Sequence, residues 1–198
     1  MKYSPLLSVF FLFPGYSIAQ NPTFADSLIS AAEERTSHTV VYDGTYQSLT
    51  YPGGDVANNR GVCTDVIIRT YRTLGIDLQK EVHEDMSANF EAYPALWQLS
   101  RPDPNIDHRR VPNLQRFFER EGSSIPVTAE AADYRPGDLV TWMLPGNLPH
   151  IGIVGHRESR DEKRYLIIHN VGRGPRQEDV LFSYPITGHY RYHRESIR

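Results

Sequence analysis

The stretch that decides the fold is G-V-C-T-D-V-I-I-R-T-Y-R-T-L-G, residues 61–75. Apolar side chains recur in it at steps of three and four residues, which is the spacing of one face of an amphipathic helix. Gly75 suits the position just after a helix, where a left-handed backbone is common. The pattern therefore predicts a helix that has Cys63 in its first turn and buries one face.

Cys63 is the single cysteine of the 198-residue chain, so no disulfide can form within the chain. In the first turn of a helix, a thiol meets unpaired backbone N–H groups and the positive end of the helix dipole, which lower its pKa. This position favours a nucleophilic thiolate whose attack is assisted by the same N–H groups. The alternative is a buried cysteine that serves as a small apolar core residue.

A thiolate nucleophile needs a base, usually a histidine that a third polar group holds in place. The segment H-I-G-I-V begins a predicted strand at His150, and the next predicted strand, Y-L-I-I-H-N, ends at His169 and Asn170. Neighbouring antiparallel strands can bring His150 and His169 side by side. Adjacent strand residues face opposite sides, so only one of His169 and Asn170 can touch His150, and we favour His169.

Helices come first in the predicted element order, and strands follow. We expect helices near residues 24–34, 78–90 and 111–121, a strand near 38–42, and further strands near 138, 150, 165 and 189. This order indicates the α+β class, with an antiparallel β-sheet packed on the Cys63 helix.

The first 19 residues have the layout of a secretory signal peptide, with Lys2, an apolar run at 6–13, and Ala19 at the expected cleavage site. The alternative is an N-terminal anchor that is not cleaved. We expect residues 20–198 to form a single domain in the periplasm or outside the cell, a monomer with no membrane span. Loss of Lys2 changes the formal charge from −3 to −4, which does not favour a nucleic-acid partner.

A second polar cluster, N-I-D-H-R-R at residues 105–110, precedes the helix expected at 111–121. Two arginines can bind a carboxylate through paired hydrogen bonds. The residues that we expect to contact the substrate are Asp65, Asp107, His108, Arg109, Arg110 and Asn170. The alternative for residues 105–110 is a helix-capping loop held by internal salt bridges.

Four motifs, G-V-C-T-D, P-G-D-L-V-T-W, H-I-G-I-V and an apolar strand that ends in His, resemble those of the NlpC/P60 branch of papain-like cysteine peptidases. From about Tyr42 to Tyr192, the chain resembles more narrowly the DUF1287 family of exported bacterial proteins. The resemblance implies a papain-like fold, with Cys63 as nucleophile, His150 as base and His169 as the residue that orients it. It also implies hydrolysis of a peptide bond in peptidoglycan stem peptides.

One departure from the NlpC/P60 pattern concerns the residues after the nucleophile, because Thr64 and Asp65 stand where Ser and Gly are usual. A carboxylate at Asp65 raises the thiol pKa if it faces the sulfur, whereas it does no harm if it caps the helix or binds a substrate amine. The identity of the cleaved bond is therefore open.

We expect no metal and no organic cofactor, and an oxyanion hole that contains the Cys63 N–H. A second donor is expected from Tyr42, Tyr46 or Tyr51 in the preceding loop. Three other functions remain open. They are a transglutaminase-like acyl transferase with the same Cys and His, a cell-wall-binding module without catalysis, and a metal-dependent hydrolase that uses His150, His169 and Asp residues.

Overall fold

The computed structural model describes residues 21–193, so the predicted signal peptide and its cleavage site lie outside the described residues. The elements in chain order are α1 (Phe24–Arg35), β1 (Val41–Tyr42), β2 (Arg60–Gly61), α2 (Cys63–Thr73), α3 (Leu78–Ala88), the 3-10 turns η1 (Phe90–Ala92) and η2 (Asp107–Arg109), α4 (Val111–Arg120), the 3-10 turn η3 (Ala131–Asp133), β3 (Leu139–Leu144), β4 (Leu148–Glu158), β5 (Tyr165–His169), β6 (Arg176–Glu178) and β7 (Ile186–Tyr190).

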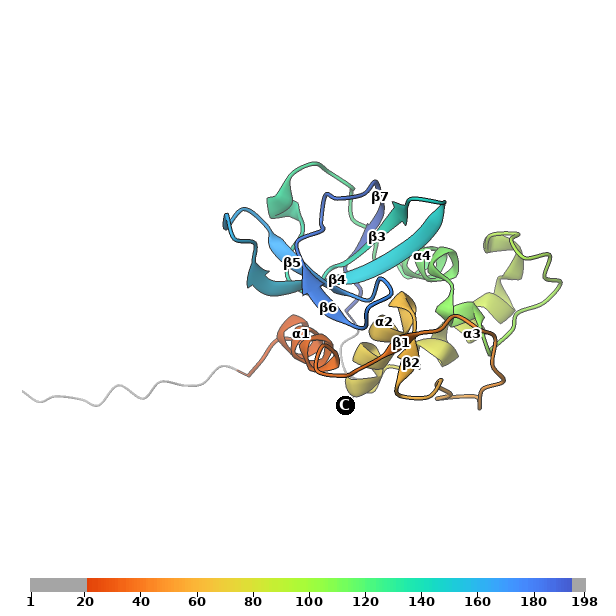
Figure 1. The fold of residues 1–198 in the computed structure, drawn as a ribbon. Helices are drawn as coiled ribbons and strands as arrows, with labels where there is room; N and C mark the ends of the chain where they lie inside the picture. Colours follow the sequence, from red (N-terminus) through yellow and green to blue (C-terminus); the bar gives the residue numbers. More distant parts are fainter. Residues whose placement is uncertain (1–20, 194–198) are drawn as a thin grey trace, which may run out of the picture.

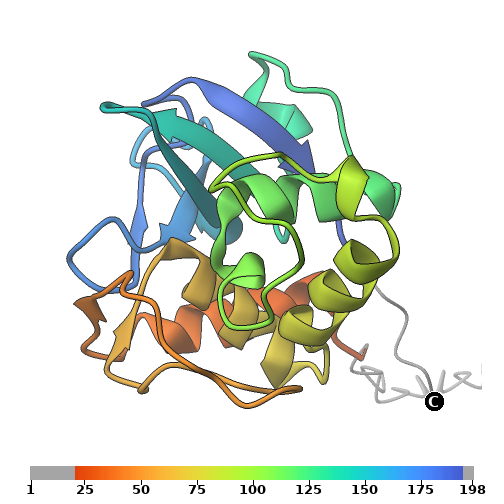
Figure 2. The same cartoon turned by 90° about the vertical axis from the view of Figure 1, so that its right-hand side faces the viewer.

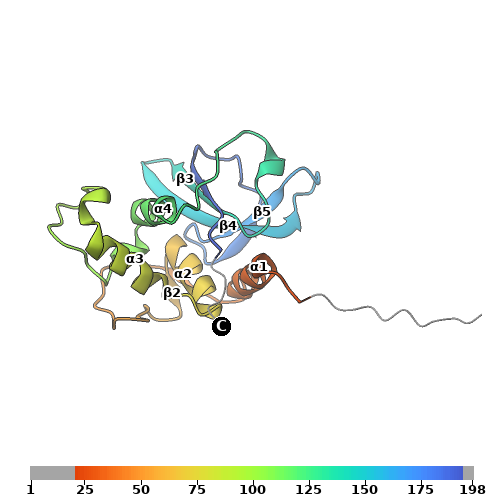
Figure 3. The same ribbon diagram turned by 180° about the vertical axis from the view of Figure 1, so that it is seen from behind.

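The main sheet has five antiparallel strands in the order β6-β5-β4-β3-β7, and the long strand β4 lies at its centre (Figure 1). The four helices gather on one face of this sheet, as the view turned by 90° in Figure 2 and the view from behind in Figure 3 show. Helix α2 packs directly against β4. The predicted α+β class, with an antiparallel sheet on the Cys63 helix, is therefore confirmed.

Each face of the sheet has its own apolar core. On the helix side, Ile151 and Ile153 of β4 pack with Cys63, Ile67 and Tyr71 of α2. This layer buries the apolar stripe that the sequence predicts for α2, and its burial supplies the main favourable term in folding.

On the other face, the loops around η3 and before β7 cover the sheet. Tyr134 and Leu181 from these loops pack on Trp142 and Val154, and the Trp142 indole N–H donates to the Leu181 carbonyl at 2.9 Å. Side chains in the middle of β4 that point away from the helices are therefore buried, as are those that point toward them. A polar site on either face of this part of β4 is shielded from water.

The predicted elements agree with the structure in most places. The predicted helices at 24–34, 78–90 and 111–121 and the four later strands are present, and α2 begins at Cys63. Gly75 follows the C-cap of α2 with φ +82°, as expected. The strand expected at 38–42 is only Val41–Tyr42. Strands β2 and β6, which have two and three residues, were not predicted. No helix within residues 21–193 has both the length and the apolar character to cross a bilayer.

Candidate active site

Cys63 is the first residue of α2, and its side chain is 4% exposed. The start of the helix is fixed by Asp65, whose carboxylate accepts a hydrogen bond of 2.6 Å from the Val62 N–H. The carboxylate therefore takes one of the N–H groups that a helix N-terminus leaves without an intrahelical partner. Asp65 therefore caps the helix, as one of its expected roles requires.

The Cys63 thiol has a pKa raised to about 11, chiefly because burial disfavours the charged thiolate. The backbone N–H groups of Ile151 and Thr64 and the Tyr42 hydroxyl bond the sulfur and oppose this rise, whereas the Asp65 carboxylate adds to it. The prediction of a lowered thiol pKa is therefore wrong for the protein without substrate. Desolvation outweighs the helix N-terminus.

His150 lies on β4, and its Nε2 is 2.8 Å from Nδ1 of His169 on the neighbouring strand β5. His169 in turn places its Nε2 3.1 Å from Oε2 of Glu178 on β6. The prediction that the two strands bring His150 and His169 side by side is confirmed. Asn170 points elsewhere, because its Nδ2 lies 3.4 Å from the Gly61 carbonyl oxygen.

The two imidazoles share a desolvated environment. Burial, and then the positive charge that His169 can carry, lowers the pKa of His150 to about 3. Burial also lowers the pKa of His169, and the Glu178 carboxylate only partly opposes this. Both rings are therefore neutral at neutral pH, which is the state in which an imidazole can accept a proton.

Cys63 and His150 meet through the backbone of β4. The sulfur accepts a hydrogen bond from the Ile151 N–H, which belongs to the peptide unit that joins His150 to Ile151. Strand β5 ends at His169, one residue before the position that would pair with Ile151, so this N–H is available to the sulfur.

The side chains of the pair lie on different sides of this backbone. His150 sits opposite Trp142 in the sheet register and contacts its ring, on the face away from the helices. Within residues 21–193, no hydrogen bond joins the thiol to the His150 ring. A proton can therefore pass directly between them only after one of the two groups moves.

The predicted substrate-binding residues make contacts inside the protein. Arg109 forms a buried ion pair with Asp65 through two hydrogen bonds of 2.9 Å. Arg110 bonds the Asp107 carboxylate at 3.0 Å. His108 is buried, and burial lowers its pKa to about 3. These contacts match the alternative of an internally paired capping loop.

The three tyrosines expected as oxyanion donors lie in different places in the structure. Tyr42 is the one whose hydroxyl reaches the sulfur, and burial together with Cys63 raises its pKa to about 12. The Tyr46 hydroxyl accepts from Nδ2 of Asn105 at 2.9 Å, and the Tyr51 ring packs edge-on against His83. Tyr42 is thus the candidate placed at the thiol.

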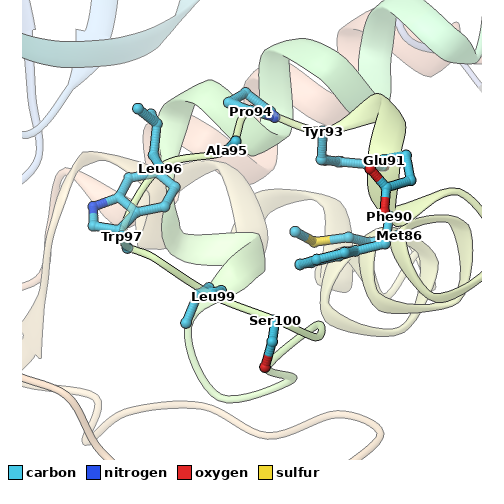
Figure 4. Close-up of a pocket in the computed structure, with 10 residues that line it drawn as sticks. All are labelled: Met86, Phe90, Glu91, Tyr93, Pro94, Ala95, Leu96, Trp97, Leu99 and Ser100. Atoms are coloured by element: carbon cyan, nitrogen blue, oxygen red, sulfur yellow. The ribbon is translucent and has the colours of Figure 1, made fainter.

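Two features were missed by the sequence analysis. Glu178, the third member of the hydrogen-bonded chain, lies in the segment R-Q-E, which carries no recognisable motif. The other feature is a cavity of about 300 Å³ between the end of α3 and the following loop, where Trp97 is 46% exposed (Figure 4). The guanidinium of Arg110 lies 4.0 Å from the centre of the Trp97 ring, which links this loop to the polar cluster at 105–110.

Metal ligands need three or more convergent side chains, commonly His, Cys, Asp or Glu. No such group occurs in the part of the chain from residue 21 to 193. The His150, His169 and Glu178 side chains form a linear hydrogen-bonded chain instead.

Comparison with known proteins places most of the described residues in one family. The profile of a family described as "Domain of unknown function (DUF1287)" matches residues 29–192. The chain is also 50% identical over 166 residues to "Uncharacterized protein YijF" of Escherichia coli (strain K12), an alignment that covers 84% of this chain and 80% of the relative. The chain belongs to the DUF1287 family.

Proposed function

We propose that this protein is an exported cysteine hydrolase of the papain-like, NlpC/P60 type that cleaves an amide bond in peptidoglycan stem peptides. The observation that carries the proposal is the contact of the Cys63 sulfur with the peptide unit of His150, whose ring is hydrogen-bonded to His169. A thiol, a neutral imidazole and a partner of that imidazole are thus contributed by α2, β4 and β5, which supports the roles of nucleophile, base and orienting residue.

The sheet and helix arrangement supports the same assignment. The Cys63 helix packs on the central strand of an antiparallel sheet, and that strand carries His150. The motifs around both residues resemble those of NlpC/P60 peptidases. We propose the periplasm or the cell exterior as the location because the sequence begins with the pattern of a signal peptide.

In the proposed reaction, thiol and imidazole are both neutral before attack. His150 takes the thiol proton through the ring nitrogen that does not bond His169, while the sulfur attacks the scissile carbonyl carbon. The Cys63 N–H and the Tyr42 hydroxyl stabilise the oxyanion. The amine leaves with the proton from His150, and water, deprotonated by the same ring, then hydrolyses the thioester and regenerates the thiol.

Access to the sulfur has to come from the side of Tyr42. The thiol is 4% exposed, whereas Tyr42, whose hydroxyl contacts it, is 44% exposed. A substrate carbonyl that displaces this hydroxyl brings its carbon to the sulfur, and its oxygen can then accept hydrogen bonds from the Cys63 N–H and the freed Tyr42 hydroxyl. The energy of substrate binding then supplies the cost of bringing the thiol and the His150 ring together.

The test is digestion of purified peptidoglycan by residues 20–198, with wild type and Cys63→Ser compared at equal concentration. We expect soluble fragments with new amino termini from wild type and at least about a thousandfold slower release from the variant. Equal release by both proteins would contradict the proposal. An added amine separates a transferase, which yields amide adducts, from a hydrolase.

The buried thiol with its raised pKa favours a second candidate, a wall-binding module without catalysis. This function predicts that wild type and Cys63→Ser sediment equally with peptidoglycan while neither releases new amino termini. The same digestion and a sedimentation measurement on its insoluble fraction distinguish the two candidates.

A further inference from the structure

The hydrogen-bonded chain that starts at His150 does not end at His169. Its three members lie on the adjacent strands β4, β5 and β6, which run side by side in Figure 1. Ile167 pairs with Glu178 in the β5–β6 register, so Glu178 and His169 are diagonal neighbours on the same face. The next basic residue on that face, Arg176, donates to the Arg173 carbonyl instead.

Glu178 determines which group donates each hydrogen bond in the series from His150 through His169 to Glu178. An ionised carboxylate only accepts hydrogen bonds, so the contact of 3.1 Å at Glu178 requires a proton on Nε2 of His169. A neutral imidazole has one N–H, which leaves Nδ1 of His169 as an acceptor. The contact of 2.8 Å then requires a proton on Nε2 of His150.

The consequence for His150 is that its other nitrogen, Nδ1, carries the lone pair. Burial keeps both rings neutral, which satisfies the condition of one N–H for each ring. If the tautomers were reversed, Nδ1 of His150 would bear a proton and could not accept one from a thiol. The tautomer of a base is commonly set by the hydrogen bond that its other nitrogen makes.

We propose that Glu178 is a positioning residue that fixes the tautomers of His169 and His150 and thereby makes Nδ1 of His150 the basic atom. Its role in turnover rests on the proposed hydrolase function, whereas its effect on the tautomers does not. The carboxylate acts through His169 and makes no contact with substrate.

The direct test is NMR of the imidazole nitrogens in the mature protein, which reports which nitrogen of each ring bears the proton. In wild type we expect protonated Nε2 and unprotonated Nδ1 on both His150 and His169. Glu178→Lys replaces an acceptor by a group that only donates, so we expect both rings to switch to protonated Nδ1. Glu178→Asp keeps the carboxylate and should retain the wild-type pattern.

Glu158→Lys is the matched control, because it makes the same change at an exposed position of β4. It should leave both tautomers unchanged. A wild-type spectrum with protonated Nδ1 on His150, or a Glu178→Lys spectrum identical to wild type, would overturn the proposal. If Glu178→Lys does not fold, the wild-type spectrum alone can still contradict the proposal.

In a peptidoglycan assay, Glu178→Lys should lower kcat by about 10- to 100-fold, which is the effect that loss of an outer hydrogen-bond partner has at metal-binding histidines. KM should stay within about twofold, and Glu178→Asp should recover most of kcat. Switched tautomers with no turnover even in wild type would refute the hydrolase function alone, whereas unswitched tautomers would refute the role of Glu178 alone.

Discussion

Two networks on the same face of the main sheet combine histidine with a carboxylate. They differ in whether every histidine ring nitrogen has a hydrogen-bond partner. His150 and His189 face the same side, because their register partners on β3 are Trp142 and Val140. In the second network, His189 donates to Asp138 at 2.8 Å. Asp138 is fully buried, as is the His189 side chain.

The Asp138 network is saturated. Its carboxylate also accepts two hydrogen bonds from Arg191, at 2.7 and 2.9 Å, and one from the Arg135 N–H. The other nitrogen of His189 faces the Pro126 carbonyl at 3.4 Å, and its ring stacks on Tyr134. Every polar group that burial has removed from water has a partner, as a structural network requires.

The His150 network, in contrast, ends at a nitrogen that makes no hydrogen bond within residues 21–193. The Cys63 sulfur contacts the backbone N–H of the next residue, Ile151, whereas the opposite end of the network, at Glu178, reaches the surface. A buried histidine that has one free ring nitrogen can accept a proton, whereas a histidine whose two ring nitrogens both have partners contributes to stability. Substitutions in the two networks should therefore affect different properties of the protein.

The largest expected effect compares His150→Gln with His189→Gln. His150→Gln removes the base, so we expect kcat on peptidoglycan to fall by about 10²- to 10⁴-fold with little change in thermal stability. His189→Gln should keep kcat but lower the free energy of unfolding by about 2 kcal/mol, because it disturbs a buried charged hydrogen bond. If His189→Gln lost activity but kept its full stability, His189 would not have the purely structural role that separates it from His150.

Asp138→Asn tests how much the Asp138 network contributes to stability. Although burial alone would raise its pKa, hydrogen bonds from His189 and Arg191 hold the pKa of Asp138 below its usual value of 3.8. The variant should lose about 3 kcal/mol of unfolding free energy at pH 7, because Arg191 loses its buried partner.

The lowered pKa also fixes the pH dependence of this stabilisation. Stability from the ionised Asp138 is fully present above pH 3.8 and is lost as pH falls through the lower folded value. Urea unfolding of wild type and Asp138→Asn should therefore give free energies that converge in strong acid. A constant difference down to that range would contradict the role of the Asp138 charge.

The sequence predicts the contact between the histidines but not the environment of the thiol. Periodicity placed α2, and strand alternation showed that only one of His169 and Asn170 can touch His150, because both are local properties of the chain. Burial of Cys63 depends on its packing against distant segments, such as Ile151 and Ile153 of β4. Since that burial decides the pKa, a local argument from the helix dipole gave the wrong direction.

The polar residues predicted to bind substrate are paired inside the protein, and their partners also come from distant segments. Arg109 and Asp65 are 44 positions apart, and their bidentate pairing is a tertiary contact that no local pattern reveals. Glu178 was missed for the corresponding reason, because its relation to His169 depends on the pairing of a three-residue strand. Charged residues near a motif therefore do not identify a binding surface without the fold.

A smaller effect is expected from His169→Ala compared with Asn170→Ala. His169→Ala leaves His150 without its orienting partner, so kcat should fall by about 10- to 100-fold. Asn170 bonds the Gly61 carbonyl and the Gly172 N–H and does not touch His150, so Asn170→Ala should keep kcat within about threefold. A fall confined to Asn170→Ala would transfer the orienting role to that residue.

The smallest expected change is the response of wild-type kcat/KM to pH. Because the pKa of His150 is lowered to about 3, the base stays active until pH falls through about 3. Because the thiol pKa is raised to about 11, the proton needed by the leaving amine is kept until pH rises through about 11. The profile should be nearly flat between these values, and an acid limb near the ordinary imidazole value of about 6.5 would contradict it.

The most direct measurement of the central claim is the mass of the protein after brief incubation with peptidoglycan fragments and acid quenching. A cysteine nucleophile predicts an acyl group on the peptide that contains Cys63, released by hydroxylamine and absent from His150→Gln. Release of new amino termini by Cys63→Ser at the wild-type rate, with no adduct on Cys63 in wild type, would show that this sulfur does not carry the reaction.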